Sequence, residues 1–163
     1  MANRVSKENY YLDIAQTVAE RCTCLRKRYG AIIVKNDVIL STGYNGAPRG
    51  RKNCIDLNYC MRNKLNIPSG ERYEMCRSVH AEANAIINAS REQMLGSTLY
   101  MVCTDPISEE LVAGTNSCMM CKRMIINAGI DKVVIRDTPT DYRVINVQDW
   151  INNDDSLTGV FGY

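Results

Sequence analysis

The sequence predicts an α/β sandwich, in which helices pack on the faces of a sheet with mixed strand directions. Helical and strand-like segments follow one another in the order helix, hairpin, helix, strand, helix, strand. A two-residue turn between two β-branched runs predicts that the first two strands are antiparallel. The chain has 163 residues, of which 45% are hydrophobic and 23% charged, and this fits a single globular domain with its own core.

The elements of the first half are predicted by local patterns. Ser6 is expected to cap a first helix of about four turns, whose apolar residues fall on one face at helical spacing. The hairpin covers residues 30–43, and the turn-forming residues 44–50 predict an ordered loop at its exit. Residues 51–79 show no persistent period. We therefore treat 1–163 as one domain with an irregular, cysteine-containing insertion at about 51–79.

The second half alternates helices and strands. These are predicted at 80–90 (helix), 97–103 (strand), 118–128 (helix) and 131–137 (strand). Gly129 is expected to end the helix before it as a C-cap. Residues 142–150 are weakly strand-like and then weakly helical, and the polar tail from Asn152 is expected to be frayed.

Composition limits the function classes. No stretch approaches the ~18 consecutive apolar residues of a membrane span, and the polar N-terminus lacks the apolar core of an export signal. We therefore expect a cytoplasmic protein, in which the eight cysteines are reduced thiols and some of them hold metal. A net charge of +2 is too small for a nucleic-acid surface. The basic groups at 21–28 and 49–52 suffice for a phosphate-bearing small molecule.

Two short motifs indicate a catalytic zinc site. His80 opens one predicted helix, and Cys118 and Cys121, three residues apart, open another and point the same way. A thiolate is favoured at a helix N-terminus by the helix dipole. One imidazole and two thiolates give zinc three ligands and leave one position for water, which the ion makes acidic.

Glu82 is expected to move protons at this site. On an ideal helix it lies about 200° from His80, so both residues can face one point only at the irregular entry to the helix. A carboxylate beside the metal that does not bind it can take a proton from water and deliver it to a base. His-x-Glu followed by Pro-Cys-x-x-Cys is the motif of zinc deaminases, and this chain matches it except that Ser117 replaces the proline.

Other functions share parts of this pattern. A Cys-x-x-Cys pair alone also fits a redox site or a structural metal knuckle. A non-catalytic zinc-held binding module has no use for Glu82, and a nucleic-acid-editing deaminase requires a basic, aromatic-lined channel. His80 is the only histidine and both motifs begin helices, which favours catalysis. The neighbouring Met and Ile residues are expected to pack in the core.

The chain resembles the deoxycytidylate (dCMP) deaminases of the cytidine deaminase-like superfamily over most of residues 8–137. Six motifs carry the resemblance: Cys24-x-Arg26, Gly30-Ala31-Ile32-Ile33-Val34, Ser41-Thr42-Gly43-Tyr44-Asn45-Gly46-x-Pro48-x-Gly50, Asn53-Cys54, His80-Ala81-Glu82-x-Asn84-Ala85-Ile86 and Cys118-x-x-Cys121-x-x-Met124-Ile125-Ile126-x-Ala128-Gly129-Ile130. The Gly-Tyr-Asn-Gly loop is the specific part, because the zinc motifs also fit cytidine, guanine and tRNA adenosine deaminases.

This resemblance implies a three-layer α/β/α sandwich with a mixed central sheet, and hydrolysis of dCMP to dUMP and ammonia as a supply of thymidylate precursor. It implies that Zn²⁺ is held by His80, Cys118 and Cys121 and that Glu82 is the catalytic residue. It also places Asn45 against the sugar and Arg26 near the phosphate.

The resemblance further implies a homo-oligomer, in particular a hexamer, and dCTP and dTTP as effectors near the loop formed by Tyr44, Asn45 and Gly46. The stretch 105–116 is longer than the corresponding link in the family. This departure leaves a dCTP-acting or dual dCMP/dCTP-acting enzyme as the alternative. Arg136, Tyr142 and the two basic groups are further candidates for phosphate binding.

A second, structural zinc is suggested by the remaining cysteines. Cys24 and Cys54 match positions that bind such an ion in some family members, and Cys60 and Cys76 would complete a four-thiol site. The alternative is that these are buried free thiols. Cys22 and Cys103 are assigned to packing.

Overall fold

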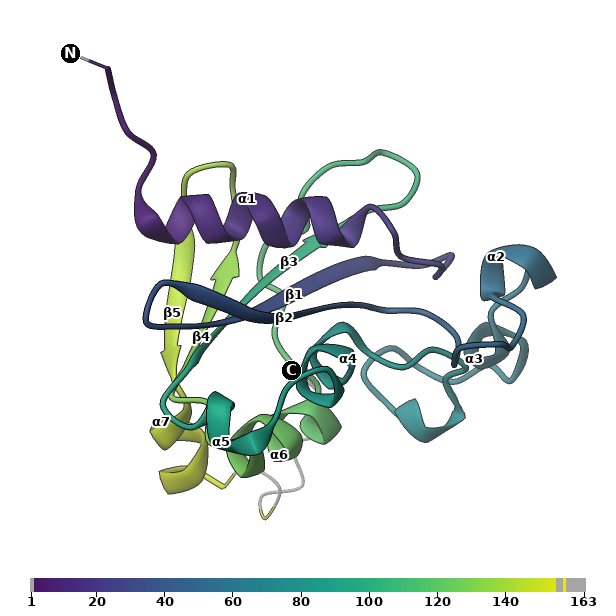
Figure 1. Cartoon of the computed structure of the whole chain (residues 1–163). Helices are drawn as coiled ribbons and strands as arrows, with labels where there is room; N and C mark the ends of the chain where they lie inside the picture. The colour runs from purple at the N-terminus through teal and green to yellow at the C-terminus, as the bar shows by residue number, and fades with distance from the viewer. Residues whose placement is uncertain (1, 155–156, 158–163) are drawn as a thin grey trace.

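The computed structural model describes residues 2–154 and 157. Its middle layer is a five-stranded sheet with the order β2-β1-β3-β4-β5 (Figure 1). The strands are β1 (Arg28–Lys35), β2 (Val38–Tyr44), β3 (Thr98–Thr104), β4 (Lys132–Arg136) and β5 (Tyr142–Asn146). β3 and β4 run parallel, whereas the other neighbouring pairs are antiparallel. The predicted mixed sheet is confirmed.

Helices cover both faces of the sheet, so the fold has three layers (Figure 1). The helix α1 packs on one face, and the shorter helices pack on the other. Their bounds are α1 (Lys7–Ala19), α4 (Ala81–Ile87), α5 (Arg91–Met94), α6 (Met119–Ala128) and α7 (Val147–Asn152). Side chains of β1 alternate between the two cores: Ile32 packs with Leu12 of α1, and Ile33 packs in the core that contains Ile125 of α6.

The predicted boundaries differ from the structure mainly in two places. The helix expected at 80–90 ends at Ile87, and a separate turn of helix, α5, begins at Arg91. The segment 51–79, expected to be irregular, contains three short helices: α2 (Cys54–Leu57), α3 (Met61–Lys64) and η1 (Tyr73–Met75). Most of the tail predicted to be frayed lies outside the described residues. No helix among those described is long and apolar enough to cross a membrane.

A buried arginine organises the segment 51–79. The Nη2 of Arg62 donates hydrogen bonds to the carbonyl oxygens of Pro68 and Glu71, at 2.8 and 2.7 Å. Its guanidinium group also lies over the ring of Tyr73, 4.3 Å from the centroid. The segment has no apolar face that could pack on the core. The polar contacts of Arg62 order it instead.

Gly43 allows α4 to pack directly on β2. A Cβ atom at this position would collide with the backbone of Ala81 and of Ala85, so only glycine permits this approach. The hydroxyl of Ser41 donates a hydrogen bond of 2.7 Å to the carbonyl oxygen of Ala85, which ties the same two elements together. The start of α4, and with it His80, is thus fixed by the exit of β2.

We expect the substitution Gly43→Ala to destabilise the protein and weaken metal binding, because α4 must move away from β2. Overpacking of this kind lowers the free energy of unfolding by about 1–3 kcal/mol. Thermal unfolding and zinc content measure the effect. The neighbouring Thr42→Ala, which changes an exposed side chain, is the matched control. Equal stability and zinc content in both variants would contradict the packing argument.

Candidate active site and metal centre

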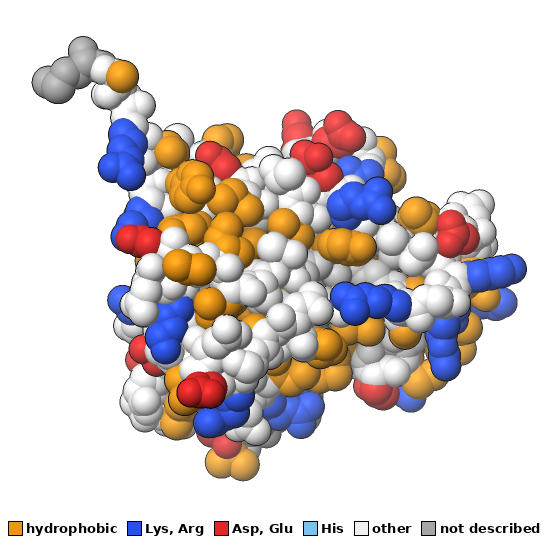
Figure 2. Space-filling view, in the orientation of Figure 1, with side chains coloured by type: hydrophobic (Ala, Val, Ile, Leu, Met, Phe, Trp, Pro, Cys, Tyr) orange, Lys and Arg blue, Asp and Glu red, His pale blue; other side chains and the backbone are white. Residues whose placement is uncertain are grey.

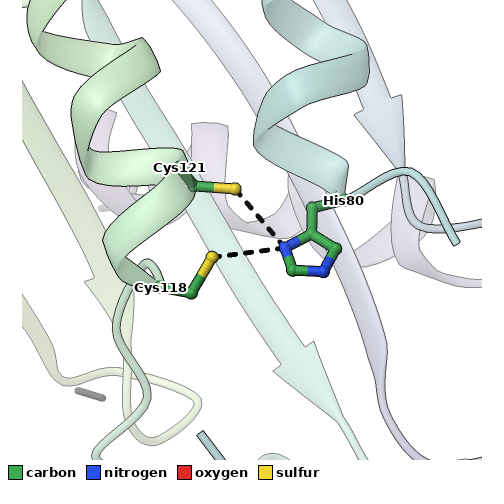
Figure 3. A group of neighbouring side chains, drawn as sticks. All are labelled: His80, Cys118 and Cys121. Atoms are coloured by element: carbon green, nitrogen blue, oxygen red, sulfur yellow. Dashed lines mark hydrogen bonds between the residues drawn. The ribbon is translucent and has the colours of Figure 1, made fainter. Parts of the chain in front are cut away.

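Two helix N-termini bring three metal-ligand side chains together (Figure 3). His80 is the N-cap of α4 and Cys118 the N-cap of α6, and both have extended backbone conformations. The Nδ1 atom of His80 lies 3.4 Å from the Sγ atoms of both Cys118 and Cys121. The three ligand atoms all lie within 4.8 Å of one another. His80 therefore precedes the regular turns of its helix, as the spacing to Glu82 required.

This group fits zinc. Tetrahedral zinc, with bonds of about 2.0 Å to nitrogen and 2.3 Å to sulfur, holds such atoms roughly 3.5 Å apart, close to the observed separation. Two sulfurs and one imidazole nitrogen are a donor set that zinc prefers. Among the described residues, no fourth His, Cys, Asp or Glu joins the group, which leaves one coordination position for water or substrate.

The two thiols share their protons unequally. A hydrogen bond from Cys121 lowers the pKa of Cys118 to about 4, and His80 contributes in the same direction against the effect of burial. The same hydrogen bond raises the pKa of Cys121, which retains the shared proton. A metal ion must displace that proton, so metal uptake releases protons.

Glu82 lies beside the metal group with its carboxyl group buried. Burial raises the pKa of Glu82 above its ordinary value, and His80 opposes this effect. The hydroxyl of Ser117, itself fully buried, donates a hydrogen bond of 3.0 Å to Glu82 Oε1. A proline, which the deaminase motif has at this position, could not make this bond. The departure from the motif thus adds a hydrogen-bond donor that holds the carboxylate.

A cavity of about 290 Å³ opens above these residues, and His80, Glu82 and Cys118 are among those that line it. This volume is near the lower end of those typical of small-molecule sites. Arg26, Lys27, Arg62 and Tyr73 also line it. Basic side chains outnumber acidic ones on these walls, which favours an anionic ligand.

The predicted substrate residues Arg26 and Asn45 both line the cavity. The side-chain amide of Asn45 accepts a hydrogen bond from the backbone of Tyr29 and donates one to the carbonyl of Lys27, at 2.8 and 2.9 Å. Asn45 therefore holds the start of β1 to the end of β2. Its contact with a sugar stays a prediction.

The loop at 44–46 is attached to the metal site. Gly46 and Val79 form a two-way backbone bridge, and Asn84 donates a hydrogen bond of 2.8 Å to the carbonyl oxygen of Tyr44. His80 directly follows Val79. Any ligand that moved this loop would therefore act on the residue next to the imidazole.

The long loop at 105–116 also lines the cavity, through Gly114, Thr115 and Asn116. Asp137 accepts a hydrogen bond from the backbone of Gly114 at 2.8 Å, and Arg143 donates one to the carbonyl of Thr115 at 2.6 Å. The extra length noted in the sequence therefore lies against the cavity, braced by the residue after β4 and by Arg143 of β5.

Two phosphate candidates lie elsewhere. Arg136 is buried beneath α1, where it donates hydrogen bonds to Asn9, Asp13 and Gln16, and neither it nor Tyr142 lines the cavity. These two candidates were wrong for this cavity. Strand β4 directs Arg136 to the α1 face of the sheet, and Tyr142 packs against the core on that same face. Conversely, the sequence did not single out Arg62 and Tyr73, which lie in a stretch without periodicity.

The four thiols assigned to a second zinc share one region. Cys24, Cys60 and Cys76 line the cavity, and Cys54 is buried close by. They do not form a compact group of candidate ligands within the described part of the chain. Cys24 accepts a hydrogen bond from the backbone of Arg26 at 3.4 Å. Burial and a hydrogen bond to His80 act in opposite directions on Cys76, and its pKa is lowered. The second zinc stays a prediction.

A His-Cys-Cys metal group beside a buried carboxyl group, within a three-layer α/β/α fold, defines a zinc-dependent deaminase. The sequence matches the family described as "Cytidine and deoxycytidylate deaminase zinc-binding region" over residues 5–137. The chain belongs to this family, and zinc is its metal cofactor.

Two named relatives of the chain are deoxycytidylate deaminases. The chain is 36% identical to the deoxycytidylate deaminase of Mycobacterium phage D29 over 137 residues, which cover 81% of this chain and 95% of the relative. It is 32% identical to the deoxycytidylate deaminase of Schizosaccharomyces pombe over 131 residues, which cover 80% of this chain but only 37% of the relative.

Solved structures share the fold. The dCMP deaminase of cyanophage S-TIM5 in complex with dCMP and dUMP matches with a TM-score of 0.54 and 28% identity, over 82% of this chain and 84% of that one. A cytidine deaminase from Burkholderia pseudomallei matches with a TM-score of 0.57 and 16% identity, over 88% of this chain and 95% of that one. The second match shows the fold alone.

Zinc analysis tests both metal sites. We expect the purified protein to hold zinc that is lost in Cys118→Ser, because two ligands cannot replace three. A second equivalent that is lost in Cys60→Ser would support the four-thiol site. Elemental analysis per chain measures both. Zinc retained in full by Cys118→Ser would contradict the first site, and one equivalent in both the native protein and Cys60→Ser would contradict the second.

Proposed function

We propose that this chain is a dCMP deaminase that hydrolyses dCMP to dUMP and ammonia and so supplies a thymidylate precursor. The observation that carries the proposal is the group of His80, Cys118 and Cys121 beside buried Glu82, at a cavity that three basic side chains also line. The named relatives from phage and yeast support dCMP as the substrate. So does the S-TIM5 structure, a complex with dCMP and dUMP.

The residues of the site have separate tasks in this proposal. His80, Cys118 and Cys121 would hold the zinc ion. When bound, the ion supplies a Lewis acid that makes a water molecule a nucleophile near neutral pH. The burial of Glu82 excludes bulk water from the point of proton transfer, which strengthens electrostatic interactions there.

Glu82 is proposed as the proton shuttle. It accepts a proton from the attacking water, whose oxygen adds to C4 of the cytosine, and delivers that proton to the ring nitrogen. It then takes the remaining hydroxyl proton and passes it to the amino group. The bond from C4 to nitrogen breaks, ammonia leaves and the carbonyl of dUMP forms. Ser117 keeps one carboxylate oxygen in place, so that the other can face the substrate.

A panel of cytosine substrates tests this function. We expect ammonia release from dCMP to exceed that from dCTP and deoxycytidine. The basic side chains that line the cavity favour a phosphate-bearing ligand, and a cavity of about 290 Å³ is small for a triphosphate. Faster turnover of dCTP would instead identify the dCTP-acting alternative, in which the loop at 105–116 accommodates a triphosphate. Glu82→Gln should lower kcat by roughly 10²- to 10⁴-fold with zinc content unchanged.

Effectors and assembly are part of the proposal. A homo-oligomer, in particular a hexamer, is supported by a largely apolar groove between α4, α5 and α6. Ile86, Met94, Met120 and Met124 line it together with Arg91, Arg123, Asn127 and Ala128. Regulation by dCTP and dTTP is supported by the backbone bridge between Gly46 and Val79, which links the loop at 44–46 to His80. A cytoplasmic location fits the eight free cysteines.

We expect dCTP to change the dCMP saturation curve, and ultracentrifugation to show a sedimentation coefficient above that of a monomer. Coupling between subunits would make the curve sigmoidal in the absence of dCTP and nearly hyperbolic in its presence. Identical curves with and without dCTP would end the effector proposal. A sedimentation coefficient that matches the monomer would end the proposed assembly.

A further inference from the structure

Arg62 is the unusual basic residue of the segment 51–79. The segment's other Lys and Arg side chains lie largely on the surface, and Figure 2 shows such side chains gathered over α2 and α3. Arg62, by contrast, is only 5% exposed and lines the cavity that contains His80 and Glu82. Arginine is rarely buried to this extent unless it is paired.

The hydrogen-bond donors of Arg62 are only partly satisfied. Nη2 bonds to two carbonyl oxygens, but the buried Nε has no acceptor in the described part of the chain. No carboxylate of that part forms a salt bridge with the guanidinium group. A buried donor without a partner is unfavourable, so it indicates an acceptor that arrives with a ligand.

A second arginine of the same cavity has the same deficiency. Arg26 approaches from the turn before β1, and its buried Nη1 also lacks an acceptor within the described residues. Lys27, the third cation of the wall, is already paired with Asp105 at 3.7 Å. Within residues 2–154 and 157, neither arginine forms a salt bridge, and both line the same cavity. Two such guanidinium groups suit a tetrahedral dianion, because they bind phosphate oxygens through paired hydrogen bonds.

Arg62 is also held at a fixed place relative to the metal group. Its guanidinium group stacks on Tyr73, whose ring meets the ring of His80 edge-on at 5.1 Å between centroids. The carbonyls of Pro68 and Glu71 fix the other side of the guanidinium group. The cation is therefore positioned before a ligand binds, which reduces the entropy lost on binding.

We propose that Arg62, together with Arg26, binds the 5′-phosphate of the substrate, so that the segment 51–79 makes the site selective for a nucleotide over the free nucleoside. This inference rests on the proposed deaminase function. It adds to that function the residue, and the segment of the chain, that read the phosphate. The base end of the substrate lies at Glu82, and the phosphate end lies against the two arginines.

The test compares dCMP with deoxycytidine in the same zinc-loaded preparations. We expect Arg62→Gln to lower kcat/KM for dCMP by roughly 10- to 100-fold, mainly through KM, because a charged hydrogen-bond partner of the phosphate is lost. The value for deoxycytidine should change by less than about two-fold, since this substrate has no phosphate to lose contact with.

Two further variants distinguish a loss of phosphate binding from a loss of structure. Arg72→Gln removes an exposed arginine of the same segment that does not line the cavity, and it should leave both substrates unaffected. Arg62→Lys keeps the charge but not the planar fork, and it should give an intermediate loss for dCMP. If Arg62→Gln cannot hold zinc, the test uses the ratio of kcat/KM for dCMP to kcat/KM for deoxycytidine in Arg62→Lys. A ratio equal to that of the native protein overturns the proposal.

Other outcomes separate this inference from the deaminase function. Equal losses for both substrates in Arg62→Gln would show that Arg62 only braces the segment, and would overturn the inference while the enzyme remains a deaminase. If the native protein released no ammonia from any cytosine substrate, the proposed function would fail. Calorimetric binding of dCMP that is weakened in Arg62→Gln would still support the phosphate site, and unchanged binding would overturn it.

Discussion

The structure depends on the meeting of two helix N-termini at one point beside the sheet. His80 caps α4 and Cys118 caps α6, so both side chains leave the chain before the regular turns begin and face each other at 3.4 Å. Gly43 sets the height of α4 on β2. A metal site built in this way needs few residues, but it tolerates no shift of either helix, because ligand geometry around zinc is strict.

The rest of the ligand site is added to this rigid centre by irregular segments. The loop at 44–46, the segment 51–79 and the loop at 105–116 each form a wall of the cavity or brace one. They are held by polar contacts from Asn45, Arg62 and Arg143 instead of by an apolar stripe. The metal group therefore fixes where the reaction occurs, and the irregular segments determine which ligands reach it.

Ser117 stands where the zinc deaminase motif has a proline. A proline here would stiffen the entry to α6, whereas serine gives its hydroxyl to Glu82 at 3.0 Å. The buried carboxyl group gains a defined orientation from a residue that adjoins a metal ligand. The hydrogen bond therefore joins the buried carboxyl group to the position directly before Cys118.

The sequence by itself determined the order of the main elements, the mixed sheet and the three side chains that meet as candidate metal ligands. Periodicity and caps are local properties, and a His-x-Glu and Cys-x-x-Cys pair restricts the chemistry strongly. Only the tertiary structure decided which arginines line the cavity. Arg136 was a phosphate candidate and is buried under α1, whereas Arg62, in a stretch without periodicity, reaches the cavity. The direction of a side chain across an irregular segment depends on contacts between residues distant in sequence, and no local pattern encodes these contacts.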